Sequence, residues 1–455
     1  MKFLNKKLLF IFTAAALVMI SCSKERLNEA NENPNAPRSV VPAVILPSVE
    51  TALAYVVGGD LSRFTTLLVQ HSVGFSRQAQ AYYSYVLTSS DFDTYWGNTY
   101  TSILGNNKDL LDRSDAGGFN VYSGISRMIM AYTLQLLVDN WGSVPYTQAL
   151  QGNDNTQPAY DDAEALYATI EHLVDKGIEQ LSDPDPGALT PGSDDIIYGG
   201  DAEKWIKFGH ALKARLFIHQ SKGNPAMAAK ALAEANMSFE DNSDNAVFLF
   251  GSAETAANPI YQFNQQRGDI DYGSGPFIDF LTNLNDPRLM VYTTPDYTDI
   301  NQAGIGDRYG SIGAGVEFIT YEEMQFVKAE AILRSDNSAS AIATAKAAYQ
   351  EGIRASMTKL GIAQSEIDAY IAANGTLPAV TNDAVSQVAF QEYLALYLNP
   401  EAFTLWRRTG SPTLTPVAGT NGIPRRLLYP QSEFSLNGSN VPQATLYTPK
   451  IFWDK

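Results

Sequence analysis

The sequence predicts a mainly α-helical protein, because apolar residues recur every three or four positions in several segments and strand-like alternation is scarce. Such apolar stripes run through residues 121–136, 161–174, 201–219 and 342–360. The starts near 121, 161 and 201 are about 40 residues apart, which suggests stacked helical hairpins. The clearest stripe is made by Val121, Ile125, Met128, Tyr132 and Leu136.

Two aspartates supply start signals for these helices. Asp161, followed by Glu164, resembles a capping box, and Asp201 is placed to cap the helix at 201–219. Between the helices, and above all from 238 to 318, the chain is rich in Gly, Asn, Asp, Pro and Tyr. Loops of that length usually carry function. No hinge-like linker divides residues 41–455, so we expect one domain in which a helical scaffold carries long irregular loops.

The first residues have the pattern of an export signal. Three lysines precede an apolar run of 13 residues from Leu8 to Ile20, which is too short to cross a bilayer. The run ends in Ile20-Ser21-Cys22, which resembles a bacterial lipobox, and Cys22 is the only cysteine in the chain. We therefore expect residues 1–21 to be a lipoprotein signal peptide, Cys22 to be lipidated, and the polar residues 22–40 to form a flexible tether.

Charge and composition exclude several classes of partner. The chain carries 32 basic and 49 acidic residues, a formal net charge of −17, so nucleic acid and anionic lipid surfaces are repelled. Contact with a membrane is expected through the lipid anchor alone. Hydrophobic residues make up 45% of the chain, enough for a large core, and the 24 tyrosines exceed what a core needs.

Catalytic and metal-binding patterns are missing from the sequence. The four histidines include no His-x-x-x-His pair, and a single cysteine cannot build a thiolate site. Neither a nucleophile elbow nor a phosphate loop is present. Residues 269–273 faintly resemble a calcium loop, but Phe280 stands where the bidentate Glu should be. We predict no catalytic residue, no cofactor and no metal site, hence no enzyme.

Several strings resemble the SusD/RagB family of nutrient-binding outer-membrane lipoproteins. They occur in the family's order and span nearly the whole chain. Ser143 departs from the family's usual Asp, which concerns a turn rather than binding. The strings are Asn-Pro-Asn at 33–35, Trp-Gly-Ser-Val-Pro-Tyr at 141–146, Asp-Pro-Arg-Leu at 286–289, the segment 321–331 ending in Lys-Ala-Glu-Ala, the segment 399–410 ending in Arg-Arg-Thr-Gly, and Arg-Arg-Leu-Leu-Tyr-Pro at 425–430.

The resemblance implies a SusD-like fold of tetratricopeptide-like helical hairpins with long loop insertions. It also implies a cell-surface lipoprotein of a Gram-negative outer membrane that binds a nutrient, a glycan or a peptide. The implied partner is a SusC-like TonB-dependent barrel, over which such proteins sit as a lid. For Trp141, Trp406, Arg407 and Arg408, which lie within the family strings, packing and ion pairing are favoured over ligand contact.

Two segments combine aromatic rings with amides and charges, as sugar recognition requires. The alternative for Trp96 is a buried helical stripe with Tyr100, Ile103 and Leu104, at even odds. Three neighbouring tyrosines cannot all face inward, so one or two should be exposed. The candidate ligand-binding residues are Tyr82, Tyr83, Tyr85, Trp96 and Asn98 in the first segment (77–98), and Tyr261, Arg267 and Tyr272 in the second (258–272).

Two other classes of function remain open. A hydrolase of surface polysaccharide could use a pair of acids that are distant in the sequence. A scaffold protein could use helical hairpins to hold other proteins. A released-sugar assay separates the hydrolase from a binding protein, and isolation of the native complex separates the scaffold from a transporter component.

Overall fold

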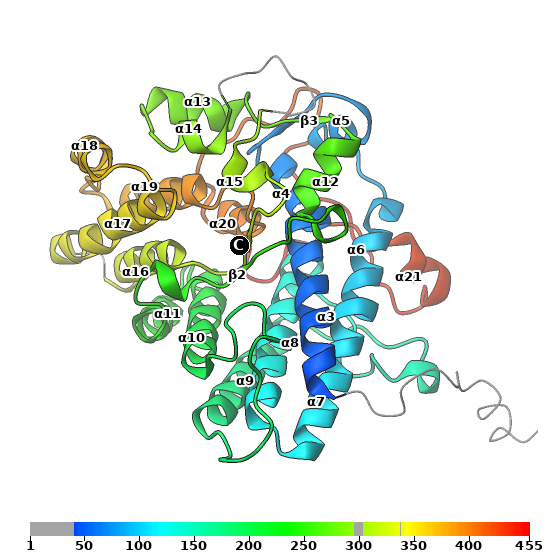
Figure 1. Cartoon of the computed structure of the whole chain (residues 1–455). Coiled ribbons are helices and arrows are strands. Elements are labelled where there is room, and N and C mark those ends of the chain that lie inside the picture. The colour runs from blue at the N-terminus through cyan, green and yellow to red at the C-terminus, as the bar shows by residue number, and fades with distance from the viewer. Residues whose placement is uncertain (1–40, 295–303, 337) are drawn as a thin grey trace, which may run out of the picture. The chain divides into compact units, whose positions relative to one another are not determined.

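The computed structural model describes residues 41–294, 304–336 and 338–455 (Figure 1). These ranges are mostly helical, which confirms the predicted fold class. The expected signal peptide 1–21, Cys22, the tether 22–40 and the Asn-Pro-Asn string lie outside the described residues.

The first half of the described chain is mostly helical, with long loops before α9 (Ala163–Ser182) and before α10 (Ala202–His219). Two stretches of π-helix, η1 (Val56–Leu61) and η3 (Thr99–Gly105), continue directly from an α-helix and lead directly into the next one. The α-helices are α3 (Pro42–Tyr55), α4 (Ser62–Leu68), α5 (Arg77–Tyr83), α6 (Asp93–Asn98), α7 (Asn106–Gly117), α8 (Asn120–Trp141), α9 (Ala163–Ser182), α10 (Ala202–His219) and α11 (Pro225–Met237).

In the second half, the described parts of the segment 238–318, residues 238–294 and 304–318, are more ordered than their composition predicts, because short helices and strands interrupt the loops. Strand β1 (Val73–Gly74) pairs antiparallel with β3 (Ile270–Asp271), and β2 (Val247–Phe248) pairs antiparallel with β4 (Val316–Glu317). The helices are α12 (Pro259–Gln266), α13 (Pro276–Asn283), α14 (Leu289–Tyr292), α15 (Asp307–Gly310), α16 (Tyr321–Ser335), α17 (Ala339–Lys359), α18 (Gln364–Asn374), α19 (Thr381–Ala395), α20 (Glu401–Thr409) and α21 (Gln431–Leu436).

Stacked helical hairpins form the scaffold, as predicted. Helix α8 packs on α9, α10 on α11, and α16 on α17, while α9 contacts α10 and α11 contacts α16, so the pairs follow one another (Figure 1). The spacing of about 40 residues has a different meaning from the one expected: it separates the single helices α8, α9 and α10, whereas each hairpin contains two helices.

The cap of α10 is the predicted one, and the cap of α9 is not. Asp201 accepts hydrogen bonds from the first-turn amides of α10 at 3.1 and 3.2 Å. At α9 the capping residue is Asp162. The prediction of Asp161 was wrong because its carboxylate is used elsewhere: it accepts from the amides of Tyr146 and Thr147 at 2.7 and 2.9 Å, which fixes the turn after α8.

One helical stretch of the described chain, residues 42–68, is long and apolar enough to cross a membrane by length and composition. More than half of its most apolar window is buried inside the fold. Leu46, Val49 and Leu61 are fully buried, and α3 packs on α7 and α8. The apolar composition of this stretch therefore matches that of a core helix.

Candidate ligand-binding site

A solvent-open pocket of about 400 Å³ lies where the first helices meet α12. Its size falls within the range of small-molecule sites. Helix α12 and helix α6 each contact η1, so the pocket gathers elements from both halves of the chain. The lining mixes aromatic rings, amides and two charges: Ala52, Tyr55, Val56, Gly59, Asp60, Arg63, Asn98, Ser102, Pro259, Gln262, Phe263 and Gln266.

Both π-helices contribute to the pocket wall. Val56, Gly59 and Asp60 come from η1, and Ser102 comes from η3. The sequence of η1, with two consecutive glycines, explains why the wall can lie so close to its neighbours: a Cβ on Gly58 would stand 2.2 Å from Cγ2 of Val316. Short π-helical segments inside α-helices occur frequently at functional sites.

Helix α12 forms the opposite wall. Asn258 caps it by accepting from the amides of Ile260 and Tyr261 at 2.8 and 3.2 Å, and Pro259 occupies its first turn, where a missing N–H costs nothing. The second candidate segment therefore folds as a capped helix, and Gln262, Phe263 and Gln266 lie on its pocket side.

The structure brings the two candidate segments together. Strand β1 lies just before the first segment and pairs with β3 of the second. Arg77 forms an ion pair with the buried Asp269 at 3.2 Å, and Arg267 donates to the Gln78 side chain at 3.2 Å. Asn98, from the first segment, lines the same pocket as residues of the second. Of the predicted ligand-binding residues, only Asn98 is a pocket-lining residue.

The three neighbouring tyrosines are less exposed than expected. Tyr82 and Tyr85 are buried, at 7% and 6% exposure, and Tyr83 is half-buried. The hydroxyl of Tyr82 donates to Asp91 at 2.9 Å, and that of Tyr85 accepts from Gln70. Burial, with the hydrogen bond to Asp91, raises the pKa of Tyr82. As ligand contacts these residues stay predictions, and Tyr83 has the most accessible ring.

Trp96 occupies the buried stripe that was its alternative. It is 4% exposed, and Ile103 and Leu104 are fully buried with it. Its ring lies 4.8 Å from that of Tyr100, and its indole N–H donates to Glu433 at 3.2 Å. Of the remaining candidates, Tyr272 is buried, which raises its pKa. Tyr261, in α12, is partly exposed, and Arg267, directly after α12, is exposed.

The pocket's two charged residues belong to one ion pair. Arg63 pairs with Asp60 three residues before it, and each side chain is about one quarter exposed. The guanidinium of Arg63 also lies over the ring of Phe263, 4.5 Å from its centroid. This cation–π contact connects α4 with α12 across the pocket. Tyr55 is anchored by its hydroxyl, which donates to the Ala257 carbonyl at 3.1 Å.

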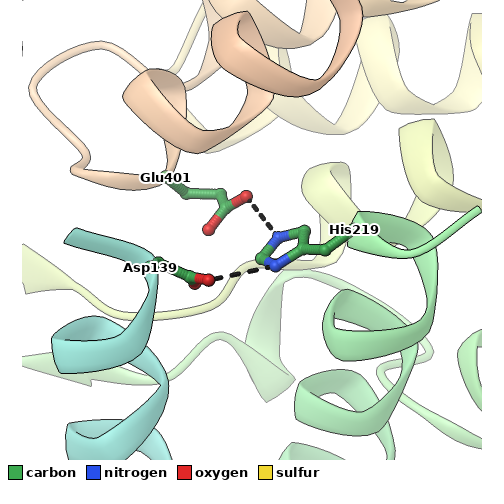
Figure 2. A group of neighbouring side chains, drawn as sticks. All are labelled: Asp139, His219 and Glu401. Carbon is green, nitrogen blue, oxygen red and sulfur yellow. Dashed lines mark hydrogen bonds and ion pairs between the residues drawn. The ribbon is translucent and has the colours of Figure 1, made fainter. Parts of the chain in front are cut away.

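A second polar cluster lies away from the pocket, in the core. Among the described residues, Asp139, His219 and Glu401 have the composition and spacing of a metal site. Figure 2 shows that the imidazole of His219 bridges the two carboxylates: its Nε2 lies 2.8 Å from Glu401, and its Nδ1 lies 3.6 Å from Asp139. The two acids therefore approach opposite ring nitrogens, whereas one ion would need both acids and one nitrogen on the same side.

The carboxylates of this core cluster already have partners. Asp139 accepts from the indole N–H of Trp453 at 2.9 Å and from the Tyr167 hydroxyl. Burial by itself raises the pKa of Glu401, but the charges of His219 and Arg215 outweigh it and hold this pKa below its ordinary value. We interpret the cluster as a structural hub, defined by Asp139, His219, Glu401, Tyr167 and Trp453, which joins α8, α9, α10, α20 and the C-terminal segment.

The residues of the family strings are buried, as predicted. Trp141 and Trp406 are 0% and 8% exposed, and Arg407 and Arg408 are 1% exposed each. Arg408 pairs with Glu330, which confirms the predicted ion pairing. Arg407 instead donates to backbone carbonyls and lies 4.9 Å from the ring of Trp453. None of these four residues lines the pocket.

A scaffold of stacked helical hairpins thus carries an open pocket of rings and amides. The chain belongs to the SusD-like family described as "Starch-binding associating with outer membrane", which matches residues 34–430. Proteins of this family are generally non-catalytic and bind nutrients at the cell surface, at the outer membrane. A comparison with curated proteins finds no match.

Solved structures share the fold at low sequence identity. A SusD/RagB family protein from Bacteroides thetaiotaomicron is 23% identical, with a TM-score of 0.71 over 91% of this chain and 99% of that one. A chitin-binding SusD homologue from Flavobacterium johnsoniae is 19% identical, with a TM-score of 0.74 over 90% and 99%. A Bacteroidetes SusD-like protein, AC2a, is 20% identical, with a TM-score of 0.76 over 91% and 100%.

The predicted set lacks Tyr55, Asp60 and Arg63, because these residues lie in an apolar helical stretch and not in an aromatic-rich loop. A signal was nevertheless present: two glycines and a charged residue interrupt the apolar helical stretch 42–68 at Gly58-Gly59-Asp60. Glycine inside a helical pattern costs stability and usually has a packing or functional reason.

Proposed function

We propose that this protein is a lipid-anchored binder of the outer-membrane surface that takes up an oligosaccharide in the pocket between η1, η3 and α12. The observation that carries the proposal is that the two segments rich in aromatic rings, amides and charges come together at one pocket, which is lined by rings and amides. Support also comes from the family and from the structural relative that is described as chitin-binding.

The anchor and tether complete the proposed organisation. Residues 1–21 act as the signal peptide, Cys22 carries the lipid, residues 22–40 form the tether, and residues 41–455 form the ligand-binding domain. A multiply acylated cysteine keeps the domain at the membrane, since two acyl chains already suffice for stable anchoring. The tether leaves the domain free to move while it keeps the effective concentration near its partner high.

The partner we propose is a SusC-like TonB-dependent barrel in the same membrane. A tethered binding protein cannot move its ligand across a bilayer, so it must transfer the ligand to a protein that can. If part of the site comes from the barrel, the isolated domain should bind its ligand more weakly than the complex does. Purification from the native membrane in mild detergent should recover a large barrel protein in equal amount; recovery of the chain alone would contradict this role.

A glycan and peptide array with the domain 41–455 tests the ligand class. We expect oligosaccharides to bind, and Ser102→Trp, which fills the pocket, to lower affinity by about tenfold or more. Thr101→Trp is the matched control, because Thr101 is exposed and does not line the pocket. Binding of peptides alone would assign the pocket to a peptide-binding lid. Equal loss in both variants would place the site elsewhere.

We further propose that the bound oligosaccharide is not cleaved. Among the described residues, the pocket lining contains one carboxylate, Asp60, which is held by Arg63, whereas glycoside hydrolysis normally uses two carboxyl groups on opposite sides of the bond. Incubation of the protein with the best array binder for several days should leave the oligomer intact. Release of sugar that stops when Asp60 is changed to Asn would contradict this proposal.

A further inference from the structure

The charge balance of the pocket points to the kind of sugar it accepts. Of the described residues that line it, only Asp60 and Arg63 carry charge, and their charges cancel. The lining is therefore neutral, although the chain as a whole has a net charge of −17.

Both members of the pair are held in place. The Arg63 guanidinium is bound at one end by Asp60, and one of its faces is covered by the Phe263 ring at 4.5 Å. Because Phe263 belongs to α12, turning Arg63 toward a ligand anion would cost both the ion pair and this contact between the two walls. The pair therefore acts as a fixed dipole rather than as a free cation.

Three uncharged polar side chains of the lining are available, whereas the Tyr55 hydroxyl and the Gln262 amide already donate to backbone carbonyls. Within the described ranges, the side chains of Asn98, Ser102 and Gln266 form no hydrogen bond, so they can bond a ligand without breaking an existing contact. Amides and hydroxyls both donate and accept, as the hydroxyl groups of a sugar do. An acidic or basic ligand, in contrast, would leave its charge partly desolvated without a free counter-charge in the pocket.

We propose that this pocket selects uncharged oligosaccharides and that the Asp60–Arg63 pair is the determinant of this selectivity. The inference rests on the proposed function, since it specifies the ligand class of the same pocket. Each residue cancels the attraction of the other: Asp60 keeps Arg63 from attracting acids, and Arg63 keeps Asp60 from attracting amines. Removing one member of the pair should therefore admit ligands of the opposite charge.

The test uses pairs of probes that differ in charge and in one small substituent, an acetyl or a methyl group. Chitin oligosaccharides are compared with their deacetylated, cationic forms, and methyl-esterified oligogalacturonates with their free acids, beside neutral glucans, mannans and xylans. With the wild-type domain, every binder should be uncharged. Asp60→Asn should raise the affinity ratio of acid to ester by about tenfold, and Arg63→Gln should raise the ratio of amine to acetylated form similarly. Asp112→Asn, in the exposed Lys108–Asp112 pair, should change neither ratio.

Each outcome has a defined consequence. Tighter wild-type binding of an acid or amine that Ser102→Trp abolishes overturns the inference but leaves the proposed function intact. Ratios that do not respond to either charge variant, while melting temperatures stay within a few degrees of the wild type, also overturn it. If no carbohydrate of any charge binds, both the proposed function and the inference are overturned.

Discussion

The clearest pH dependence should arise from Glu50 in α3. This side chain is fully buried, and one of its carboxyl oxygens accepts from the amide of Ile196 at 2.7 Å. Its neighbour Asp195 accepts from three backbone amides and from the Trp205 indole. Burial first, and the charge of Asp195 second, hold the pKa of Glu50 well above its ordinary value of 4.5.

The sign of the effect follows from this upward shift. A carboxyl whose folded-state pKa is raised contributes its full stabilisation below its unfolded-state pKa and loses it as the pH rises toward the folded-state pKa. Across that interval only the folded state holds the proton, so the free energy of unfolding falls by about 1.4 kcal/mol per pH unit from this group alone. Above the folded-state pKa the loss is complete.

Glu50→Gln removes this titration and keeps the shape of the side chain. The Gln carbonyl can still accept from Ile196, and its NH₂ group can donate to Asp195, as the protonated acid does. We therefore expect the variant to gain on the wild type by about 1.4 kcal/mol for each pH unit above about 5, until the difference levels off. The measurement is urea unfolding of both proteins from pH 5 to 9. Other buried carboxyls are common to both and cancel in the difference.

Two results would refute this reasoning. If the difference in unfolding free energy does not change with pH, Glu50 has the same pKa in both states. If Glu50→Gln is less stable than the wild type at every pH, the Glu50–Asp195 contact depends on the carboxyl group of Glu50, and an amide of the same shape does not replace it.

Three further predictions concern packing, the hub and the anchor. Gly58→Ala should destabilise the domain by about 1–3 kcal/mol, because the added methyl would overlap Val316 and force the pocket wall to shift. The control Gly97→Ala, with no atom within 4 Å of the added methyl, should be neutral or slightly stabilising. Equal effects of the two variants on urea unfolding would contradict the close approach of η1 and Val316. His219→Ala should cost about 3–5 kcal/mol, because two buried carboxylates lose their common partner; a loss below 1 kcal/mol in the same assay would show that the hub carries little stability. Cys22→Ala should yield an exported protein that no longer partitions into detergent, and membrane fractionation in cells that lack any partner checks this.

The helical class and most helix positions could be predicted because they depend on local spacing. The stripe from Val121 to Leu136 lies within α8, and the Asp201 cap needed nothing beyond its own helix. The cap of α9 could not be assigned with confidence between adjacent aspartates, because the role of Asp161 depends on a turn after the preceding helix. The pairing of β1 with β3 likewise depends on residues about 200 positions apart, which no local pattern encodes.

The two candidate segments come together at one pocket, whereas of the individual candidate residues only Asn98 lines it. Both segments lie at the pocket, because amides and charges gather where a chain faces solvent. Which rings point inward could not be predicted, because the partners that bury them come from distant segments. The indole of Trp96, for instance, is bound by Glu433, 337 positions away. Asp60 and Arg63 could not be recognised as site residues for a different reason: they lie within an apolar helical stretch, which is typical of a core helix.

The hub also has a consequence for how the domain folds. Its hydrogen bonds join positions very far apart in the chain: Asp139 and Trp453 are separated by 314 positions, and His219 and Glu401 by 182. A partly collapsed chain that lacks any one of these segments would bury charges without their partners, which is strongly unfavourable. The hairpins can therefore form early and locally, but the core can close only in a late, cooperative step of high contact order, which should set the folding rate of the domain.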